Sequence, residues 1–249
     1  MRLHWLFLTV SILVPPIAES AYYPELEELK TPLGTVRVVE KYRNQPIDNS
    51  LTVNGKIVYR SPIGIGLYSQ FQYSDGVAVL FGENQGGNNW VWDLSFLLLR
   101  PNHKPSIITA RDFHSVDGTV EARQDGDDVV VELGFEEKKR KTARLRSGKL
   151  SVEHNRVVSV IPVSEEDCKR LHENSADECI QNRKHGNPQC DPNKGAYFGG
   201  SVSEMSDFTV LSHHPGFVES ALAETCALEC KSGVAVPYEQ FKKSVCSIK

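Results

Sequence analysis

All six cysteines of the chain fall in its last third, and none precedes residue 168. An even number of cysteines in an exported chain is typical of a disulfide framework, so three bridges are expected if all of them pair. The last third is therefore predicted to be cross-linked, whereas the rest must rely on its own core. The six are Cys168, Cys179, Cys190, Cys226, Cys230 and Cys246.

Two of these cysteines are one helical turn apart. Cys226 and Cys230 lie in the segment 215–231, whose apolar residues recur at helical spacing before Ser232 and Gly233. Side chains four residues apart on a helix point the same way, which suits the restricted geometry of a disulfide poorly. Each is therefore predicted to bond to a partner outside this helix, and the sequence leaves the remaining connectivity open.

The start of the chain indicates export. Residues 1–20 combine an early arginine, a short apolar run and small residues at Ala18 and Ser20, which predicts a signal peptide cleaved after Ser20. The apolar run is shorter than the roughly 20 residues that cross a bilayer, so no stable membrane insertion of the mature chain is expected. The chain has no Asn-x-Ser/Thr site for glycosylation, which favours the bacterial periplasm.

Residues 21–160 are predicted to form an antiparallel β domain. Asn54-Gly55 stands between two strand-like runs, and both residues accept the positive φ of a type I′ turn. The run 129–135 alternates, so Val129, Val131, Leu133 and Phe135 should share one buried face. Further turn pairs, with no helical repeat between them, indicate a sandwich or an open barrel. They lie at 75–76, 117–118, 125–126 and 147–148.

Residues 161–249 are predicted to form a small helical domain, which makes the whole chain α+β. Ser164 precedes three acidic residues, as at a helix N-terminus, and Ser175 has capping-box spacing for a second short helix. A last helix is expected over 237–246. The net charge of −4 lies entirely in 161–249, so neither part shows the basic balance of a nucleic-acid-binding protein.

The sequence predicts neither a catalytic residue nor a cofactor or metal site. Gly82 and Gly87 have P-loop spacing, but Asn88 replaces the lysine and a strand-like run follows. The cysteines lack zinc-finger spacing, and the strained serine motif GxSxG is absent. Two histidine patterns are alternatives for a reactive site: Asp112 near His114, and the pair 213–214.

The basic run Lys138-Lys139-Arg140-Lys141 is predicted to form an exposed hairpin tip or edge. Lysines there would discourage unwanted strand pairing. Contact with an acidic partner or with anionic headgroups is the functional alternative.

The layout of residues 34–153 resembles that of exported, β-rich proteobacterial proteins. The resemblance is carried by TVRVVEKY, LTVNGKIVYR, GVAVLFGENQGGNNWVWDLSFLLL and VEARQDGDDVVVELGF. Some proteins of this kind are periplasmic immunity partners of toxins delivered by type VI secretion, including lipid-degrading toxins. The resemblance implies a protein partner, namely a cognate toxin or envelope enzyme.

The leading prediction is a non-enzymatic periplasmic immunity or inhibitor protein, which would occlude the active site of a lipid- or peptidoglycan-degrading toxin. An envelope hydrolase with a site not recognisable from sequence and a structural envelope protein are the alternatives. In WVWDLSFLLL, Trp90 and Trp92 are expected to point into the core with Leu94 and Phe96. The candidate contacts are Glu83, Asn84, Gln85, Asn88, Asn89, Lys138, Arg140, Glu165 and Glu166.

Overall fold

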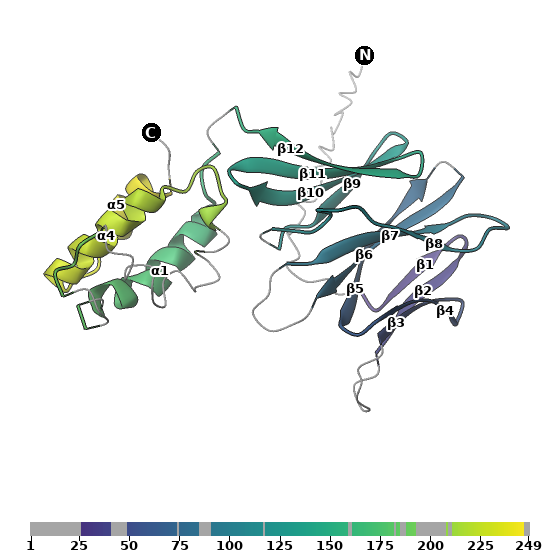
Figure 1. Ribbon diagram of the computed structural model, residues 1–249, viewed down its shortest axis with the longest axis horizontal. Helices are drawn as coiled ribbons and strands as arrows, with labels where there is room; N and C mark the ends of the chain where they lie inside the picture. The colour runs from purple at the N-terminus through teal and green to yellow at the C-terminus, as the bar shows by residue number, and fades with distance from the viewer. Residues whose placement is uncertain are drawn as a thin grey trace, which may run out of the picture.

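The computed structural model describes residues 26–40, 49–73, 75–84, 91–116, 118–158, 161–181, 183–184, 188–192, 208 and 211–246. Strands occupy the first part of the chain and helices the last part (Figure 1). The strands are β1 (Glu28–Thr31), β2 (Gly34–Val39), β3 (Asn49–Val53), β4 (Lys56–Ser61), β5 (Gly64–Tyr73), β6 (Gly76–Asn84), β7 (Asp93–Leu99), β8 (Ser106–Ile108), β9 (Glu121–Asp125), β10 (Asp128–Glu136), β11 (Lys139–Arg146) and β12 (Lys149–Arg156). The helices with described bounds are α1 (Glu165–Gln181), α4 (Glu219–Ser232) and α5 (Tyr238–Val245). The predicted signal peptide and its cleavage site lie outside the described residues.

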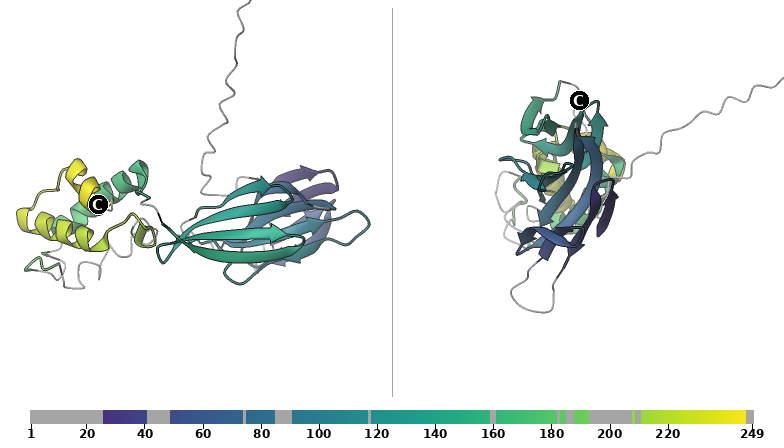
Figure 2. Two further views of the ribbon diagram at one scale, coloured as in Figure 1. Left: turned by 90° about the horizontal axis from the view of Figure 1, so that it is seen from above. Right: turned by 90° about the vertical axis from the view of Figure 1, so that its right-hand side faces the viewer.

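The strands form three antiparallel sheets of four strands each, in the orders β1-β2-β3-β4, β5-β6-β7-β8 and β12-β11-β10-β9. The sheet of β5 to β8 lies between the other two (Figure 1). One core cluster joins it to the sheet of β9 to β12, and a second cluster joins it to the sheet of β1 to β4. The helices lie beyond one end of the strands (Figure 2).

Burial on both faces explains the continuous apolar runs of the middle sheet. Along β6, Val77, Val79 and Phe81 belong to the cluster shared with the sheet of β1 to β4. Ala78 and Leu80, which alternate with them, belong to the other cluster. A strand with one face in water would instead show polar residues at every second position.

The predicted core position of Trp92 is confirmed. Its side chain is buried in the same cluster as Leu94 and Phe96, because these residues alternate along the chain and share one face of the sheet. Trp90, for which the same position was predicted, lies outside the described residues.

Two predicted hairpin turns are confirmed by their backbone angles. Asn54–Gly55 has φ values of 50° and 75°, and Ser147–Gly148 has 47° and 75°, as a two-residue type I′ turn requires. The turn between β10 and β11 is the hairpin tip predicted for the basic run. It uses Glu137–Lys138 at φ values of 49° and 65°, a conformation that residues with a side chain adopt far less readily than glycine.

The prediction for Phe135 is wrong. Val129, Val131 and Leu133 share the buried face of β10, but the pairing of β10 with β11 shifts register between Glu132 and Phe135. Gly134, at φ 83°, reverses the alternation at this point. Phe135 is therefore only half-buried, and its ring packs against His214 of the helical part, with ring centres 4.7 Å apart.

The first helix begins where the sequence predicts and continues further than predicted. Ser164 Oγ accepts a hydrogen bond from the Asp167 N–H at 3.0 Å, as an N-cap does. The second short helix expected from Ser175 is wrong, because Ser175 lies inside α1. Ser175 belongs to the buried face of α1, together with Cys168, Leu171 and Cys179, which follow one another at helical spacing.

The disulfide prediction is confirmed, including the separate partners of the two cysteines on α4. The bridges are Cys168–Cys246, Cys179–Cys226 and Cys190–Cys230. The first two bridges connect helices around one core cluster, to which Phe217, Leu222 and Phe241 also belong, and the third ties the segment 188–192 to α4. Helix α4 ends at Gly233, as predicted, with φ 72° and an N–H bonded to the Glu229 carbonyl at 2.8 Å.

The prediction of a mostly antiparallel α+β chain is confirmed. The finer prediction of a sandwich or an open barrel is not confirmed, since the strands form three sheets. Three disulfides indicate an oxidising environment, either extracellular or periplasmic. Among the described residues, no helix combines the length and the apolar character needed to cross a membrane.

Candidate functional site

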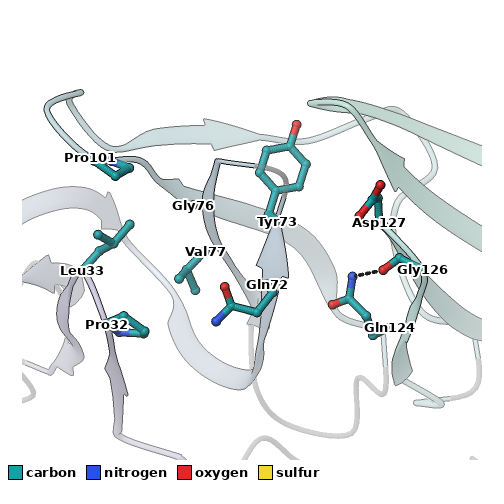
Figure 3. A pocket seen from close by; sticks show the side chains of 10 residues that line it. All are labelled: Pro32, Leu33, Gln72, Tyr73, Gly76, Val77, Pro101, Gln124, Gly126 and Asp127. Atoms are coloured by element: carbon teal, nitrogen blue, oxygen red, sulfur yellow. Dashed lines mark hydrogen bonds between the residues drawn. The ribbon is translucent and has the colours of Figure 1, made fainter.

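The structure contains a pocket at the end of the sheets that is remote from the helices, which we call the turn end. Turns of all three sheets meet there (Figure 3), and the pocket has a volume of about 340 Å³. This volume is at the small end of the range for pockets that hold small molecules. The pocket is lined by Pro32, Leu33, Gln72, Tyr73, Gly76, Val77, Pro101, Gln124, Gly126 and Asp127.

The apolar side of the pocket comes from the turn between β1 and β2. The Leu33 N–H donates to Thr31 Oγ1 at 3.1 Å, and this hydroxyl donates to the Gly34 carbonyl at 2.7 Å. Leu33 packs against the core cluster to which Val77 belongs, and Figure 3 shows both side chains on the same side of the pocket. This wall is therefore held by hydrogen bonds and by the core together.

The middle of the pocket is fixed by Tyr73 and its neighbours. Tyr73 is buried, and the Arg100 guanidinium lies over its ring, 5.4 Å from the ring centre. Arg100 also donates to Asp75 Oδ1 at 2.9 Å across the turn between β5 and β6. At Gly76 an added Cβ would lie 2.0 Å from the Leu99 carbonyl oxygen, so only glycine permits this approach of β6 to β7.

The polar side of the pocket comes from the turn between β9 and β10. The Gln124 amide donates to the Gly126 carbonyl at 2.8 Å (Figure 3) and to the Asp128 carbonyl at 3.2 Å. Asp128 is bound by Arg146, whereas Asp127 is exposed and makes no ion pair with any described residue. The pocket thus combines an apolar wall with a carboxylate at its rim.

This arrangement suits a cationic side chain. The aliphatic stem of a lysine or arginine can lie along an apolar wall while its charged end reaches a carboxylate. Leu33 and Val77 provide that wall, and Asp127 provides the carboxylate on the opposite side (Figure 3).

A second group of polar side chains lies at the opposite end of the sheets, beside the helices. The side chain of Lys141 is fully buried, and its Nζ lies 3.0 Å from Glu136 Oε2 and 2.9 Å from His114 Nε2. His154 Nε2 lies 2.7 Å from the same carboxylate oxygen of Glu136. We call these four residues the Glu136 cluster.

The electrostatics of the Glu136 cluster favour a structural role. Partial burial would raise the pKa of Glu136, but hydrogen bonds from His154 and Lys141 outweigh it and lower the pKa to about 2. A carboxylate that is always ionised near neutral pH is a poor general acid or base. The Lys141 ammonium also stands where a metal ion bound by His114 and Glu136 would have to lie.

Among the described residues, one group of side chains has its possible metal-ligating atoms within 4.8 Å of one another, namely Cys179, Cys226 and Glu229. The two cysteines are joined in a disulfide, and Glu229 Oε1 accepts the Val236 N–H at 2.8 Å. Disulfide sulfurs are not the thiolates that bind zinc. This group is therefore a part of the helical core.

The two histidine patterns singled out in the sequence have different surroundings in the structure. Asp112 lies in a turn at φ 65°, and the carboxylate nearest to His114 is that of Glu136, 3.8 Å away. His213 and His214 hold the helical part to the sheets. The His213 carbonyl accepts the Lys138 N–H at 3.1 Å, and burial lowers the pKa of His214 to about 4.

Of the candidate contact residues between 83 and 89, the structure describes Glu83 and Asn84. Glu83 accepts a hydrogen bond from the Tyr59 hydroxyl at 2.7 Å, and burial together with this bond raises the pKa of Tyr59 to about 12. Asn84 is buried and donates to the Val91 carbonyl at 2.9 Å. Gln85, Asn88 and Asn89 lie outside the described residues.

The basic run is exposed, as predicted, at Lys138, Lys139 and Arg140, but not at Lys141. Lys138 does occupy the hairpin tip, but its ammonium donates to the carbonyls of His214 at 2.8 Å and Phe217 at 3.2 Å. Lys141 is fully buried, so the prediction of an exposed edge is wrong for this residue, because its charge is matched by Glu136. Arg140 is exposed.

The two candidate contact residues at the start of α1, Glu165 and Glu166, are both exposed. Glu165 is bound by Lys242 and by the Tyr238 hydroxyl, and the side chain of Glu166 is 88% exposed. The structure brings this helix start, the hairpin tip and the strand ends beside Asn84 to the same end of the sheets (Figure 1). The turn-end pocket lies at the other end.

The pocket is the feature that sequence reasoning missed. The turns at 75–76 and 125–126 were recognised individually, but a local pattern does not show which turns meet in space. No family model matches the chain, and no curated protein or solved structure matches it either.

Proposed function

We propose that the chain is an exported, non-enzymatic protein-binding module of the bacterial periplasm. We further propose that it is an immunity or inhibitor protein, which neutralises a lipid- or peptidoglycan-degrading toxin by occluding the active site of that toxin. The observation that carries the proposal is the turn-end pocket, with its apolar wall and, at the rim, Asp127, which makes no ion pair with a described residue. Such a pocket can receive a basic side chain of a partner and needs no chemistry to do so.

The rigidity of the pocket supports binding. Its turns are held by Thr31, Gln124 and Arg100 through the hydrogen bonds described above. Loops that are already ordered lose little conformational entropy when a partner binds, so more of the contact energy appears as affinity. The acidic rim would also attract a basic surface over a distance of about one Debye length.

The location within the envelope rests on two observations. The three disulfides require an oxidising compartment, and the first 20 residues have the composition of a signal peptide. The resemblance in layout to type VI immunity proteins supports the choice of a toxin as the partner.

The proposal is tested with three charge-reversal variants of the purified mature chain. Asp127→Lys changes the pocket, Glu166→Lys changes the helix end, and Glu224→Lys, at another exposed acid, is the matched control. Binding is measured by calorimetry against the toxin candidate encoded by the neighbouring gene. We expect Asp127→Lys alone to weaken binding by about tenfold to a hundredfold, as charge reversal at a binding hot spot does.

Protection is measured in the same experiment series by expressing the toxin in the periplasm with each variant. If the wild-type chain neither binds nor protects, the proposed function is wrong. If only Glu166→Lys loses binding, the function holds and the helix end, predicted from the sequence, is the binding surface.

An envelope hydrolase is the second candidate, because the structure does place His114 beside a carboxylate, that of Glu136. Against this, Lys141 donates toward His114 Nε2, the nitrogen that a catalytic base would need free. The hydroxyl nearest in sequence, that of Ser115, is buried and accepts the Trp92 N–H at 3.1 Å. A His114→Ala variant that loses protection while keeping toxin affinity would favour the hydrolase.

A further inference from the structure

The edge strand β12 carries an inference that is independent of the proposed function. β12 ends the sheet order β12-β11-β10-β9 and pairs with β11 over eight residues without a register shift. All eight of its residues are exposed or half-buried, and none is proline. Long, regular and uncovered edges are rare in monomers, because they present unpaired backbone groups to other chains.

The other edges in the described part of the chain are less available. β8 has only three residues, and the pairing of β3 with β4 contains a register shift. β1, β5 and β9 lie at contacts between sheets, where β5 meets both β1 and β9. β12 is therefore the edge best suited to pairing with another strand.

The turn between β11 and β12 tells which backbone groups of β12 are free. Arg146 and Lys149 flank the two-residue turn, so they form a hydrogen-bonded pair. In an antiparallel ladder hydrogen-bonded and non-hydrogen-bonded pairs alternate, so every second residue after Lys149 is also hydrogen-bonded to β11. Lys149, Ser151 and Glu153 therefore direct their backbone groups toward β11. Leu150 and Val152, which alternate with them, direct theirs outward.

The side chains of β12 are complementary to a second copy of the same strand. In an antiparallel pair centred on Ser151, Lys149 lies opposite Glu153 of the other copy, and Leu150 lies opposite Val152. Both charged residues of this pair are exposed, and neither makes an ion pair with a described residue. Directly opposite charges and directly opposite apolar side chains both stabilise antiparallel pairs.

Neighbouring alignments lack this complementarity. Centring the pair on Glu153 or on Lys149 places like charges directly opposite one another, which is destabilising. Centring it on Val152 places Lys149 opposite Asn155 and Glu153 opposite Ser151, so that both ion pairs are lost. The charges therefore select one alignment.

We propose that two copies of the chain associate through their β12 strands, in the antiparallel alignment centred on Ser151, to form one continuous eight-stranded sheet. The contact is isologous, as in most two-subunit proteins. In this alignment Leu150 of one copy and Val152 of the other exchange N–H to carbonyl hydrogen bonds. The paired segment, residues 149–153, is short, so the dimer dissociates readily.

The test is sedimentation equilibrium of the purified mature chain over about 10 μM to 1 mM, the range in which small interfaces associate. We expect the average mass to rise toward that of a dimer. Lys149→Glu and Glu153→Lys should each weaken association by about tenfold, since each places two like-charge pairs in the interface. The double exchange Lys149→Glu with Glu153→Lys should restore it. Glu121→Lys, on the opposite edge strand of the same sheet, should leave it unchanged.

Hydrogen exchange provides a second measurement that does not depend on the variants. The amides of Leu150 and Val152 should exchange more slowly at high than at low protein concentration, whereas those of Ser151 and Glu153, already bonded to β11, should not change. A chain that stays monomeric up to 1 mM, or a dimer that both single reversals leave intact, would overturn the proposal. So would a β12 edge that binds a strand of another protein while the chain itself remains monomeric.

Discussion

Replacing Glu136 by glutamine should destabilise the sheets by about 3 kcal/mol, because the substitution leaves the buried ammonium of Lys141 without its carboxylate. Lys141 has no exposed side-chain surface, and its other polar neighbour in the Glu136 cluster is His114 at 2.9 Å. Breaking a buried ion pair by removing one partner costs about 3–5 kcal/mol. We take the lower end, because Glu136 itself is 30% exposed and part of its charge is already solvated.

The assay is urea unfolding followed by tryptophan fluorescence, to which Trp92 contributes from the core between the sheets. For a chain of this length, a loss of about 3 kcal/mol corresponds to a melting temperature lower by about 6–12 °C. Three variants are compared: Glu136→Gln, Lys141→Met and both together. The double variant removes the pair and leaves no uncompensated charge, so it should be clearly more stable than Glu136→Gln alone.

The pH dependence provides an independent check of the same reasoning. The pKa of Glu136 is lowered from 4.5 to about 2, so the unfolded chain takes up a proton at this site before the folded chain does. Its contribution is fully present above about pH 4.5 and is lost as the pH falls toward 2. Two results would contradict the buried ion pair between Lys141 and Glu136: a decrease of less than about 1 kcal/mol in the free energy of unfolding of Glu136→Gln at pH 7, or a double variant no more stable than Glu136→Gln.

Three further predictions concern the helical part and its attachment. Burial lowers the pKa of His214 from 6.5 to about 4, so the contact between the helical part and the sheets should weaken as the pH falls from 6.5 to 4. The measurement is amide hydrogen exchange around His214, which should become faster over this pH range. His214→Asn should remove this pH dependence. Lys138→Met removes the ammonium that donates to two backbone carbonyls and lies over the Phe217 ring, and it should weaken the contact between the helical part and the sheets by about 1–3 kcal/mol. An unchanged rate of proteolysis between the helical part and the sheets would contradict this. Replacing Cys168 and Cys246 by serine opens a loop of 78 residues and should destabilise the helical part by about 4.5 kcal/mol in the chain-entropy account, measured by helical circular dichroism, with little change at Trp92.

Local features of the fold were predictable because their causes are local. Asn54–Gly55 and Ser147–Gly148 form turns through the φ values that these residues accept, whatever lies around them. The separate partners of Cys226 and Cys230 followed from helix geometry alone. The prediction for Phe135 was wrong because one glycine, Gly134, adopts a positive φ and reverses the alternation of side chains along the strand.

The candidate site was harder to predict because its parts come from distant segments. The pocket joins turns whose residues lie up to about 95 positions apart in sequence, from Pro32 to Asp127, and no local pattern records that they meet. Lys141 was assigned to an exposed basic run because its neighbours in sequence are charged, whereas its burial depends on Glu136 and His114 across the sheet. Charge patterns in a strand show which residues are polar but not which side of the sheet each one occupies.

The construction of the pocket from turns has a consequence for how such a protein can diversify. The strands that carry the turns are fixed by two apolar clusters, and the turn residues Pro32, Gly126 and Asp127 lie outside both of them. Substitutions at such positions can alter the shape and charge of the pocket while the strand register stays the same. A lineage of these chains could therefore follow a changing partner by exchanging a few turn residues, much as variable loops do on a conserved immunoglobulin framework.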